Sequence, residues 1–272
     1  MTKIFKETKV LLRNIPALLV ALLIASVICM NLLANKSIDL GLDWLALDCG
    51  IFFSWIAFLT MDVVTRRYGQ RAANILTVVA LLVNLLVALI FLIVSFVPGT
   101  WSQSYVEGSE TLINGALDKT IASSWYVIMG SSVAFVASAF LNNFLHFLIA
   151  RSIKKSNFLA FGVSSYASTF IAQFVDNLLF ALIVSLHFFG WNIVQCLTCA
   201  VTGAVAELLC EVAFSPVGYA VVKDLEKHDV GREYLDLVAQ NKELKEKKKA
   251  EKTENKELKG KKKAEKTENK AK

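Results

Sequence analysis

The chain alternates long apolar runs with short polar connections, and six of the runs are long enough to cross a lipid bilayer. A transmembrane helix needs about 20 mostly apolar residues, because the hydrocarbon core is about 30 Å thick. The runs are Ile15–Leu33, Leu45–Met61, Ala72–Val97, Ser124–Ala150, Ala167–Phe189 and Ile193–Val222. This pattern predicts an all-α, polytopic membrane protein with six transmembrane helices. The first run follows several cations, as in a signal peptide, but its length favours an uncleaved helix.

The polar connections differ in charge from one side of the predicted membrane to the other. The N-terminal segment and the loops after the second and fourth runs hold four, three and three Lys or Arg residues. The opposite connections hold one, one and none. Cytoplasmic loops are enriched in Lys and Arg, so both termini are predicted to lie in the cytoplasm and the protein in the cell membrane. The longest connection, Pro98–Ser123, is then external.

The charged residues are concentrated at the C-terminal end. Only 19% of the chain is charged and 55% is hydrophobic, yet 17 of the 29 Lys and Arg residues lie from Lys223 onward. We therefore divide the chain into a transmembrane domain, 1–222, and a cytoplasmic Lys/Glu-rich tail, 223–272. From Glu243 the tail repeats a 14-residue unit, ELKEKKKAEKTENK and ELKGKKKAEKTENK. Such a segment cannot form a core and is expected to be disordered or a lone helix, with attraction to anionic lipids as the alternative.

Several function classes lose support from this pattern. The net charge of +6 flanks apolar runs and does not gather on a folded face, which argues against nucleic-acid binding. Cys196 and Cys199 form a C-x-x-C inside an apolar run, where packing is the simpler interpretation than metal or redox chemistry. The sequence has no G-x-S-x-G, no H-E-x-x-H and no phosphate-binding glycine loop, so we expect neither enzyme activity nor a cofactor.

Polar residues within the apolar runs are the candidates for function. A charged residue at the centre of a bilayer costs about 2.5–3.5 kcal/mol, so such residues usually face a helix-bundle interior. Helical spacing places four groups of residues on common faces. They are Thr169, Gln173, Asp176 and Phe180; Gly203, Glu207 and Glu211; Ser131, Ser138, Asn142 and His146; and Asp48, Phe52, Trp55 and Asp62. We predict that these faces line one shared interior.

The chemistry of these groups suits a small polar solute. A carboxylate such as Asp176 or Glu207 accepts two adjacent hydrogen bonds, as the N–H and amino group of a guanine-type edge would offer. Trp55 and Phe180 could stack on a planar ring, and an acid would also suit an amine cation. Hydrogen bonding between helices is the alternative for Asn142. Asp62 and Arg66, one turn apart, form either a structural ion pair or a gate.

Three segments resemble the queuosine precursor transporters, a vitamin-uptake-like family. LLANKSIDLGLDWLALDCGIFFSWIAFLTMDVVTRRYG carries the first, with Asp62, Arg66, Tyr68 and Gly69 at its motif positions. SSYASTFIAQFVDNLLFALI carries the second, with Ser168, Thr169, Gln173, Asp176 and Phe180. The third runs from Glu207 to SPVGY, with Pro216 and Tyr219. The resemblance spans about Asn31–Val222. Many relatives have Lys where this chain has Glu207 and Glu where it has Arg66, so the two form a pair of reversed sign if they interact.

The resemblance implies import of a 7-deazaguanine (preQ0, preQ1 or queuine) for queuosine salvage into tRNA. The alternative is a substrate-binding subunit of an energy-coupling-factor vitamin transporter, which would require an ATPase partner. Ala17, Ala21 and Ala25 form a small-residue stripe that could serve such docking, although internal packing is the simpler interpretation. A membrane assembly factor without transport is a third hypothesis, but it would have no need for Asp176 and Glu207 together.

Overall fold

The computed structural model describes residues 3–38, 40–45, 47–100, 110–153, 158–244 and 246–247. The chain divides into two compact units, which we describe separately. The larger unit is Ile15–Asp229, and the smaller unit combines Met1–Asn14 with Val230–Lys272.

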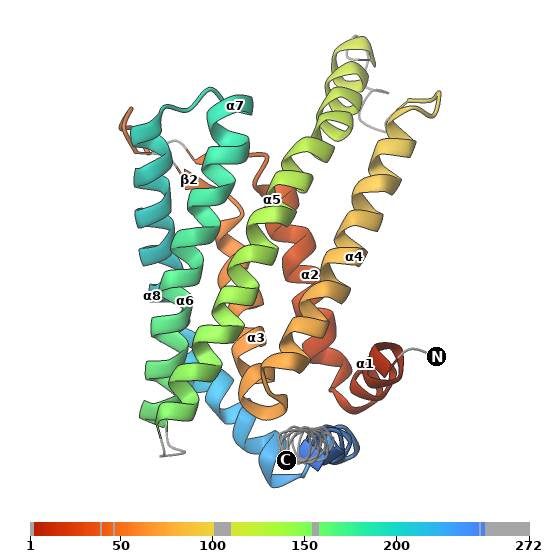
Figure 1. The fold of residues 1–272 in the computed structure, drawn as a ribbon. Helices are drawn as coiled ribbons and strands as arrows, with labels where there is room; N and C mark the ends of the chain where they lie inside the picture. Colours follow the sequence, from red (N-terminus) through yellow and green to blue (C-terminus); the bar gives the residue numbers. More distant parts are fainter. Residues whose placement is uncertain are drawn as a thin grey trace, which may run out of the picture. The chain divides into compact units, whose positions relative to one another are not determined.

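The larger unit is almost entirely helical (Figure 1). Its helices are α2 (Ala17–Leu33), α3 (Ile51–Tyr68), α4 (Gln70–Ser95), α5 (Glu110–Ser152), α6 (Phe158–Phe180), the π-helical turn η2 (Ala181–Ser185), α7 (Leu186–Phe188) and α8 (Ile193–Lys227). Each of the six predicted runs thus contains a helix of this unit, although the bounds differ. The all-α prediction is confirmed for the described residues.

Four stretches are long and apolar enough to span a membrane by themselves. They are α4, Trp125–Ser152 of α5, the continuous stretch Phe158–Phe188, and α8. Phe5–Asn14, taken together with α2 as one bent span, would make a fifth. The number of qualifying helices is smaller than the six predicted spans for two reasons. α2 has only 17 residues by itself, and Asp62, Arg66 and Arg67 reduce the hydropathy of α3. The protein is therefore a multi-pass membrane protein with four to five spans by length and composition.

The long helices pack around a common interior. In sequence, α3 packs against α4, α4 against α5, α5 against α6, α6 against α8, and α8 back against α3. α2 contacts α3, α4 and α5. This ring gives α3, α5, α6 and α8 each one face toward the interior, where the polar residues lie.

α3 begins six residues later than the predicted Leu45. Leu47 and Asp48 instead form β2, which pairs antiparallel with β1 (Ser37–Ile38). Asp48 accepts a 2.7 Å hydrogen bond from the backbone N–H of Gly50. A Cβ at Gly50 would lie 2.7 Å from the carbonyl oxygen of Met30, so only glycine fits at this approach. The predicted start of this helix was wrong because it depends on contacts with other segments of the chain. The hydrophobic periodicity of one segment does not predict such contacts.

Two other helices begin earlier than predicted. α5 starts at Glu110, so its first turns occupy part of the predicted external connection Pro98–Ser123. Residues 101–109 of that connection, including Trp101 and Tyr105, lie outside the described residues. α6 starts at Phe158 rather than Ala167. A helix of 43 residues is about 65 Å long, so α5 is roughly twice as long as the hydrocarbon core is thick.

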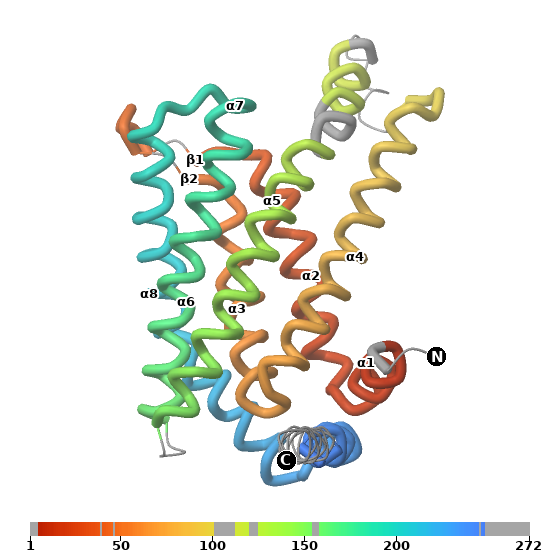
Figure 2. Tube along the Cα trace, viewed as in Figure 1, coloured from red at the N-terminus to blue at the C-terminus, as the bar shows by residue number. Residues whose placement is uncertain are grey.

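The hairpin formed by β1 and β2 lies at the same end of this unit as the start of α8 (Figure 2). Thr198 donates to the carbonyl oxygen of Trp44 at 2.7 Å, and Gln195 to that of Asp43 at 2.8 Å. Trp191 packs in a cluster with Cys196 and Cys199, against Leu47. Both cysteines are buried and free, in agreement with a packing role.

The smaller unit contains α1 (Lys3–Asn14) and a second helix that begins at residue 232. Asn14 donates to a carboxylate oxygen of Glu233 at 3.0 Å, and Leu11 and Tyr234 are buried. α8 of the larger unit runs to Lys227, past the predicted domain boundary at residue 222. Except for residues 243–244 and 246–247, the two-copy repeat lies outside the described residues.

Candidate functional site

Three of the four predicted polar faces lie in the interior. On α5, Ser131, Ser138, Asn142 and His146 are all buried. On α6, Thr169, Gln173 and Phe180 are buried, and Asp176 keeps part of its surface exposed. On α8, Gly203, Glu207 and Glu211 are buried. The helical periodicity predicted these faces correctly.

The face predicted for α3 was wrong. Phe52 is 61% exposed, and Asp48 is not in the helix. The buried face of α3 instead contains Ser54, Phe58 and Asp62, at four-residue steps. A helix that starts at Ile51 cannot extend the stripe back to Asp48, so the polar residue that joins Asp62 on this face is Ser54.

The predicted aromatic residues pack against protein. Trp55 stacks on Phe214 of α8, with ring centroids 4.5 Å apart, and its indole N–H donates to the carbonyl oxygen of Phe52. Phe180 is buried in an apolar cluster that includes Val127 and Val184. One face of the Trp55 ring is therefore already occupied, which leaves only its other face for a planar solute.

The first polar group, which we call the carboxylate region, contains Asp48, Gln173, Asp176 and Glu207. Asp176 accepts a 2.6 Å hydrogen bond from the hydroxyl of Ser138 on α5. Glu207 accepts one from the hydroxyl of Ser54 on α3 and one, at 3.3 Å, from the amide of Asn177 on α6. Four helices thus contribute to this region.

The three carboxylates of this region act on one another. Asp176 is repelled by Asp48, and Glu207 by both Asp176 and Asp48. Burial raises the pKa of Asp48, which lies in β2 outside the helices, to about 6, and its hydrogen bond from Gly50 opposes the rise. Among the described residues no His, Cys, Asp and Glu side chains form a group suited to a metal ion. Protonation of one of these acids or a bound cation would relieve the repulsion.

Gln173 has an unusual position in this region. Its side chain is fully buried, yet neither its amide nitrogen nor its amide oxygen has a hydrogen-bond partner among the residues that the structure describes. An unpaired buried amide costs about 1–3 kcal/mol per group. Buried polar groups are normally satisfied, so an unpaired amide one turn from Asp176 on the same helix is a candidate ligand-binding group.

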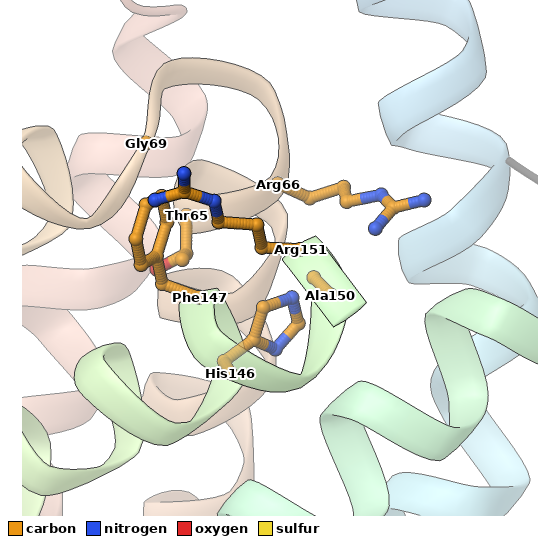
Figure 3. Close-up of a pocket in the computed structure, with 7 residues that line it drawn as sticks. All are labelled: Thr65, Arg66, Gly69, His146, Phe147, Ala150 and Arg151. Atoms are coloured by element: carbon orange, nitrogen blue, oxygen red, sulfur yellow. The ribbon is translucent and has the colours of Figure 1, made fainter. Parts of the chain in front are cut away.

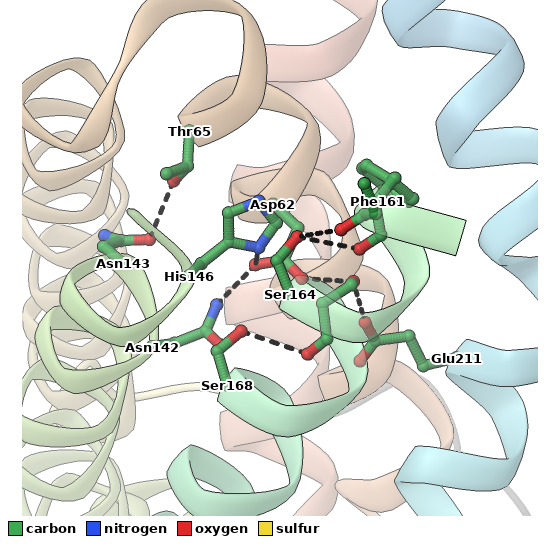
Figure 4. A network of polar contacts seen from close by, with 11 residues as sticks. Asp62, Thr65, Asn142, Asn143, His146, Phe161, Ser164, Ser168 and Glu211 are labelled. Atoms are coloured by element: carbon green, nitrogen blue, oxygen red, sulfur yellow. Dashed lines mark hydrogen bonds and ion pairs between the residues drawn. The ribbon is translucent and has the colours of Figure 1, made fainter. Parts of the chain in front are cut away.

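The second polar group, which we call the Asp62 cluster, contains Asp62, Asn142, His146, Ser165 and Glu211 (Figure 4). The Asn142 amide donates to Oδ1 of Asp62 at 2.7 Å, and Nδ1 of His146 lies 3.1 Å from the same oxygen. The hydroxyl of Ser165 contacts both Oδ2 of Asp62 and Oε1 of Glu211. The cluster thus joins α3, α5, α6 and α8 through side chains that are all buried.

Arg66 does not pair with Asp62 or with Glu207. In the described part of the chain, the ion-pair partner of Asp62 is His146. Arg66 lines a cavity of about 250 Å³ with Thr65, Gly69, His146, Phe147, Ala150 and Arg151 (Figure 3). In that view the Arg66 guanidinium points away from His146, and it interacts electrostatically with Lys223 of α8. Arg66 therefore belongs to the rim of this cavity.

Sequence reasoning did not select three residues that connect the site. Ser54, Ser165 and Asn177 each hydrogen-bond a carboxylate from another helix. Ser165 lies one turn before Thr169, and Asn177 lies four residues after Gln173, between Asp176 and Phe180. Extending the predicted face of α6 by one turn toward its start would have found Ser165, and the four-residue step from Gln173 would have found Asn177. Ser54 could not be selected from the predicted face of α3, because the structure shows that a different face of this helix is buried.

Comparison with protein-family models matches residues 48–221 to the family described as "Putative vitamin uptake transporter". A search of curated proteins and a search of solved structures each found no match. The matched segment contains every residue of the carboxylate region and of the Asp62 cluster. With nearly two thirds of its length matched, the chain belongs to the vitamin uptake transporter family.

Proposed function

We propose that this protein imports 7-deazaguanine precursors of queuosine across the cell membrane. Family membership supplies the general activity, uptake of a vitamin-type solute. The observation that carries the choice of solute is the buried, unpaired amide of Gln173, one turn before Asp176 on the inward face of α6.

The hydrogen-bonding groups of this region match a guanine-type ring. The Gln173 amide offers one donor and one acceptor, which suits the carbonyl and the adjacent ring N–H of such a base. A carboxylate accepts an N–H and an amino group side by side. A solute that satisfies these groups removes the cost of leaving them unpaired, which favours it over an apolar solute of the same shape.

The charge of the region supports a preference among the precursors. Asp48, Asp176 and Glu207 repel one another, and an amine cation would relieve that repulsion. PreQ1 and queuine carry an amine on the substituent of the ring, whereas preQ0 carries a neutral nitrile. We therefore expect uptake of preQ1 or queuine to exceed that of preQ0.

The test uses a bacterial strain that cannot synthesise 7-deazaguanines and lacks its own importer. The full chain, the Asp176→Ala variant and the Glu226→Gln variant are expressed separately, and each strain receives preQ0, preQ1 or queuine at low concentration. We expect queuosine in tRNA with the wild-type chain and with Glu226→Gln, whose carboxylate lies in the exposed part of α8, and loss with Asp176→Ala. Failure of the wild-type chain with all three solutes, at normal membrane expression, would sink the proposal.

One observation favours the alternative of a subunit that docks on an ATPase complex. Ala17, Ala21 and Ala25 lie on an exposed face of α2, so the small-residue stripe is available to a partner helix. Such a subunit would support uptake only in cells that also contain the ATPase. Uptake by the purified chain alone in lipid vesicles would exclude this alternative.

A further inference from the structure

The Asp62 cluster contains a hydrogen-bond arrangement that needs one more proton than its hydroxyl can supply. Ser165 is in hydrogen-bond contact with a carboxylate oxygen of Asp62 and with one of Glu211. A hydroxyl has a single hydrogen, so it can donate to only one of them. The other contact is a hydrogen bond only if that carboxyl group is protonated and donates to the oxygen of Ser165. With both carboxyl groups ionised, the second contact would be repulsive.

A cavity lies beside the cluster. His146 is fully buried and is among the residues that line the cavity bordered by Arg66 and Arg151 (Figure 3). Its Nδ1 lies 3.1 Å from Oδ1 of Asp62, but neither ring nitrogen forms a hydrogen bond with a partner among the described residues, so a small rotation of the ring is needed to align Nδ1 with Asp62. An imidazole with one nitrogen at a carboxylate and the other unpaired beside a cavity has the arrangement of a proton shuttle.

We infer that His146, Asp62, Ser165 and Glu211 form a proton-binding site, loaded through the cavity beside His146, that couples proton movement to transport. The site is separate from the carboxylate region and does not depend on which solute is carried.

Each proton transfer in this relay conserves hydrogens. Cavity water gives a proton to Nε2 of His146, and the hydrogen on Nδ1 passes to Oδ1 of Asp62, which returns the ring to its neutral form. Rotation of the Asp62 carboxyl group about its Cβ–Cγ bond brings this proton to Ser165. The serine then accepts it on Oγ while it gives its own hydrogen to Oε1 of Glu211, so the net result is one proton moved from the cavity to Glu211.

The other charged groups near the cluster are few. On α3 the neighbouring charged residue is Arg66, one turn from Asp62. On α5 it is Arg151, which lies at the rim of the cavity. α6 contributes hydroxyl groups, Ser165 and Thr169, of which Thr169 interacts with Glu211. From α8 it is Glu207, one turn from Glu211. α4 carries Arg71 in its exposed first turn, and the buried polar residues of α2 are Ser26 and Asn31.

The link to the solute lies on α8. Glu207 and Glu211 are four residues apart on the same buried face, which corresponds to about 6 Å along the helix. The charge on Glu211 therefore acts on Glu207 at short range in a medium of low dielectric constant. Protonation of Glu211 lowers the negative charge near the carboxylate region, so it lowers the affinity of that region for a cation.

The test records the infrared C=O stretch of protonated carboxyl groups in the full-length protein, reconstituted in lipid vesicles without any transported solute. We expect wild type to show a band that disappears as the pH is raised. The same component should be lost in both Asp62→Asn and Glu211→Gln, and retained in Glu226→Gln, the matched control on α8. Because no solute is present, this result is independent of the proposed function.

Two milder variants keep the test informative if the acidic variants fold poorly. Ser165→Ala removes the shared hydroxyl and should shift the midpoint of the band by about one pH unit or more. His146→Gln should keep the band but slow its appearance after a pH jump by at least about tenfold. A band that is absent from wild type, that persists in both acidic variants, or that Na⁺ abolishes at constant pH would overturn the inference.

Discussion

The Asp62 cluster and the carboxylate region use the same four helices and similar residues, but they differ in how their carboxyl groups are connected to one another. In the Asp62 cluster both carboxylate oxygens of Asp62 are engaged, by Asn142, His146 and Ser165. In the carboxylate region the amide of Gln173 is unpaired and three acids repel one another. A shared partner such as the Ser165 hydroxyl links two acids and can hold a proton, whereas an unpaired buried amide costs stability and is a candidate ligand-binding group.

The largest expected effect comes from breaking the Asp62 cluster. Asp62→Ala leaves the Asn142 amide, His146 and Ser165 without their shared partner in the interior, so we expect a loss of about 3–5 kcal/mol in the free energy of unfolding. Thermal unfolding in detergent micelles measures it. Glu226→Ala removes the partner of Lys223 at the surface and should cost under about 0.5 kcal/mol. Equal effects of the two variants would show that the cluster is not structural.

A pH-dependent effect is expected at Asp48. Burial raises its pKa from 3.8 to about 6, so the folded state disfavours the ionised form, and stability from this group is lost as the pH rises from about 4 through 6. Asp48→Asn stays neutral and retains an oxygen for the Gly50 N–H. Well above pH 6 the variant should be more stable than wild type by about 3 kcal/mol, and below pH 4 the two should agree. A difference that does not change with pH would contradict this assignment.

A smaller gain in stability is expected at Gln173. Gln173→Leu replaces an unpaired buried amide with an apolar side chain of similar size, so it should stabilise the protein by about 1 kcal/mol or more. The same change should abolish uptake if the amide binds the solute. Combined thermal unfolding and uptake assays check both parts. A Leu variant that is less stable than wild type would mean that the amide has partners inside the protein.

The smallest effect tests the contact between α6 and α8. A Cβ at Gly203 would lie 2.8 Å from the amide nitrogen of Asn177, which holds Glu207. Gly203→Ala should therefore gain less than the roughly 0.5–1 kcal/mol that alanine usually adds within a helix. Gly115→Ala on α5 is the matched control, since nothing lies within 4 Å of its Cβ. If the Gly203 variant gains as much as the control, the close approach has no energetic consequence.

The sequence predicted the interior faces of α5, α6 and α8 well because apolar and polar residues repeat there without interruption at helical spacing. Ser138, Asn142 and His146, for example, are all buried as expected. A periodicity that continues through a whole helix fixes which side faces inward, whatever the neighbouring helices do.

What the sequence could not provide are the contacts between helices. Asp62 and Arg66 are close along the chain and of opposite charge, yet Asp62 pairs with His146 from α5. The start of α3 depends on the approach of Gly50 to Met30, which involves another helix. Both features depend on how one helix is rotated about its axis and shifted along it relative to its neighbour. The pattern of polar residues along one helix does not specify either quantity.

The close approach of Gly203 to Asn177 also has a mechanical consequence. Because there is no space for a Cβ at this point, the two helices approach each other closely there, and a tilt of α8 against α6 would pivot about this contact. The Ser165–Glu211 contact joins the same two helices, two turns further along α8 from Gly203. A small tilt that weakens the binding of a solute in the carboxylate region would change the separation of Ser165 and Glu211 in the Asp62 cluster. Movements at the two sites would then be mechanically coupled.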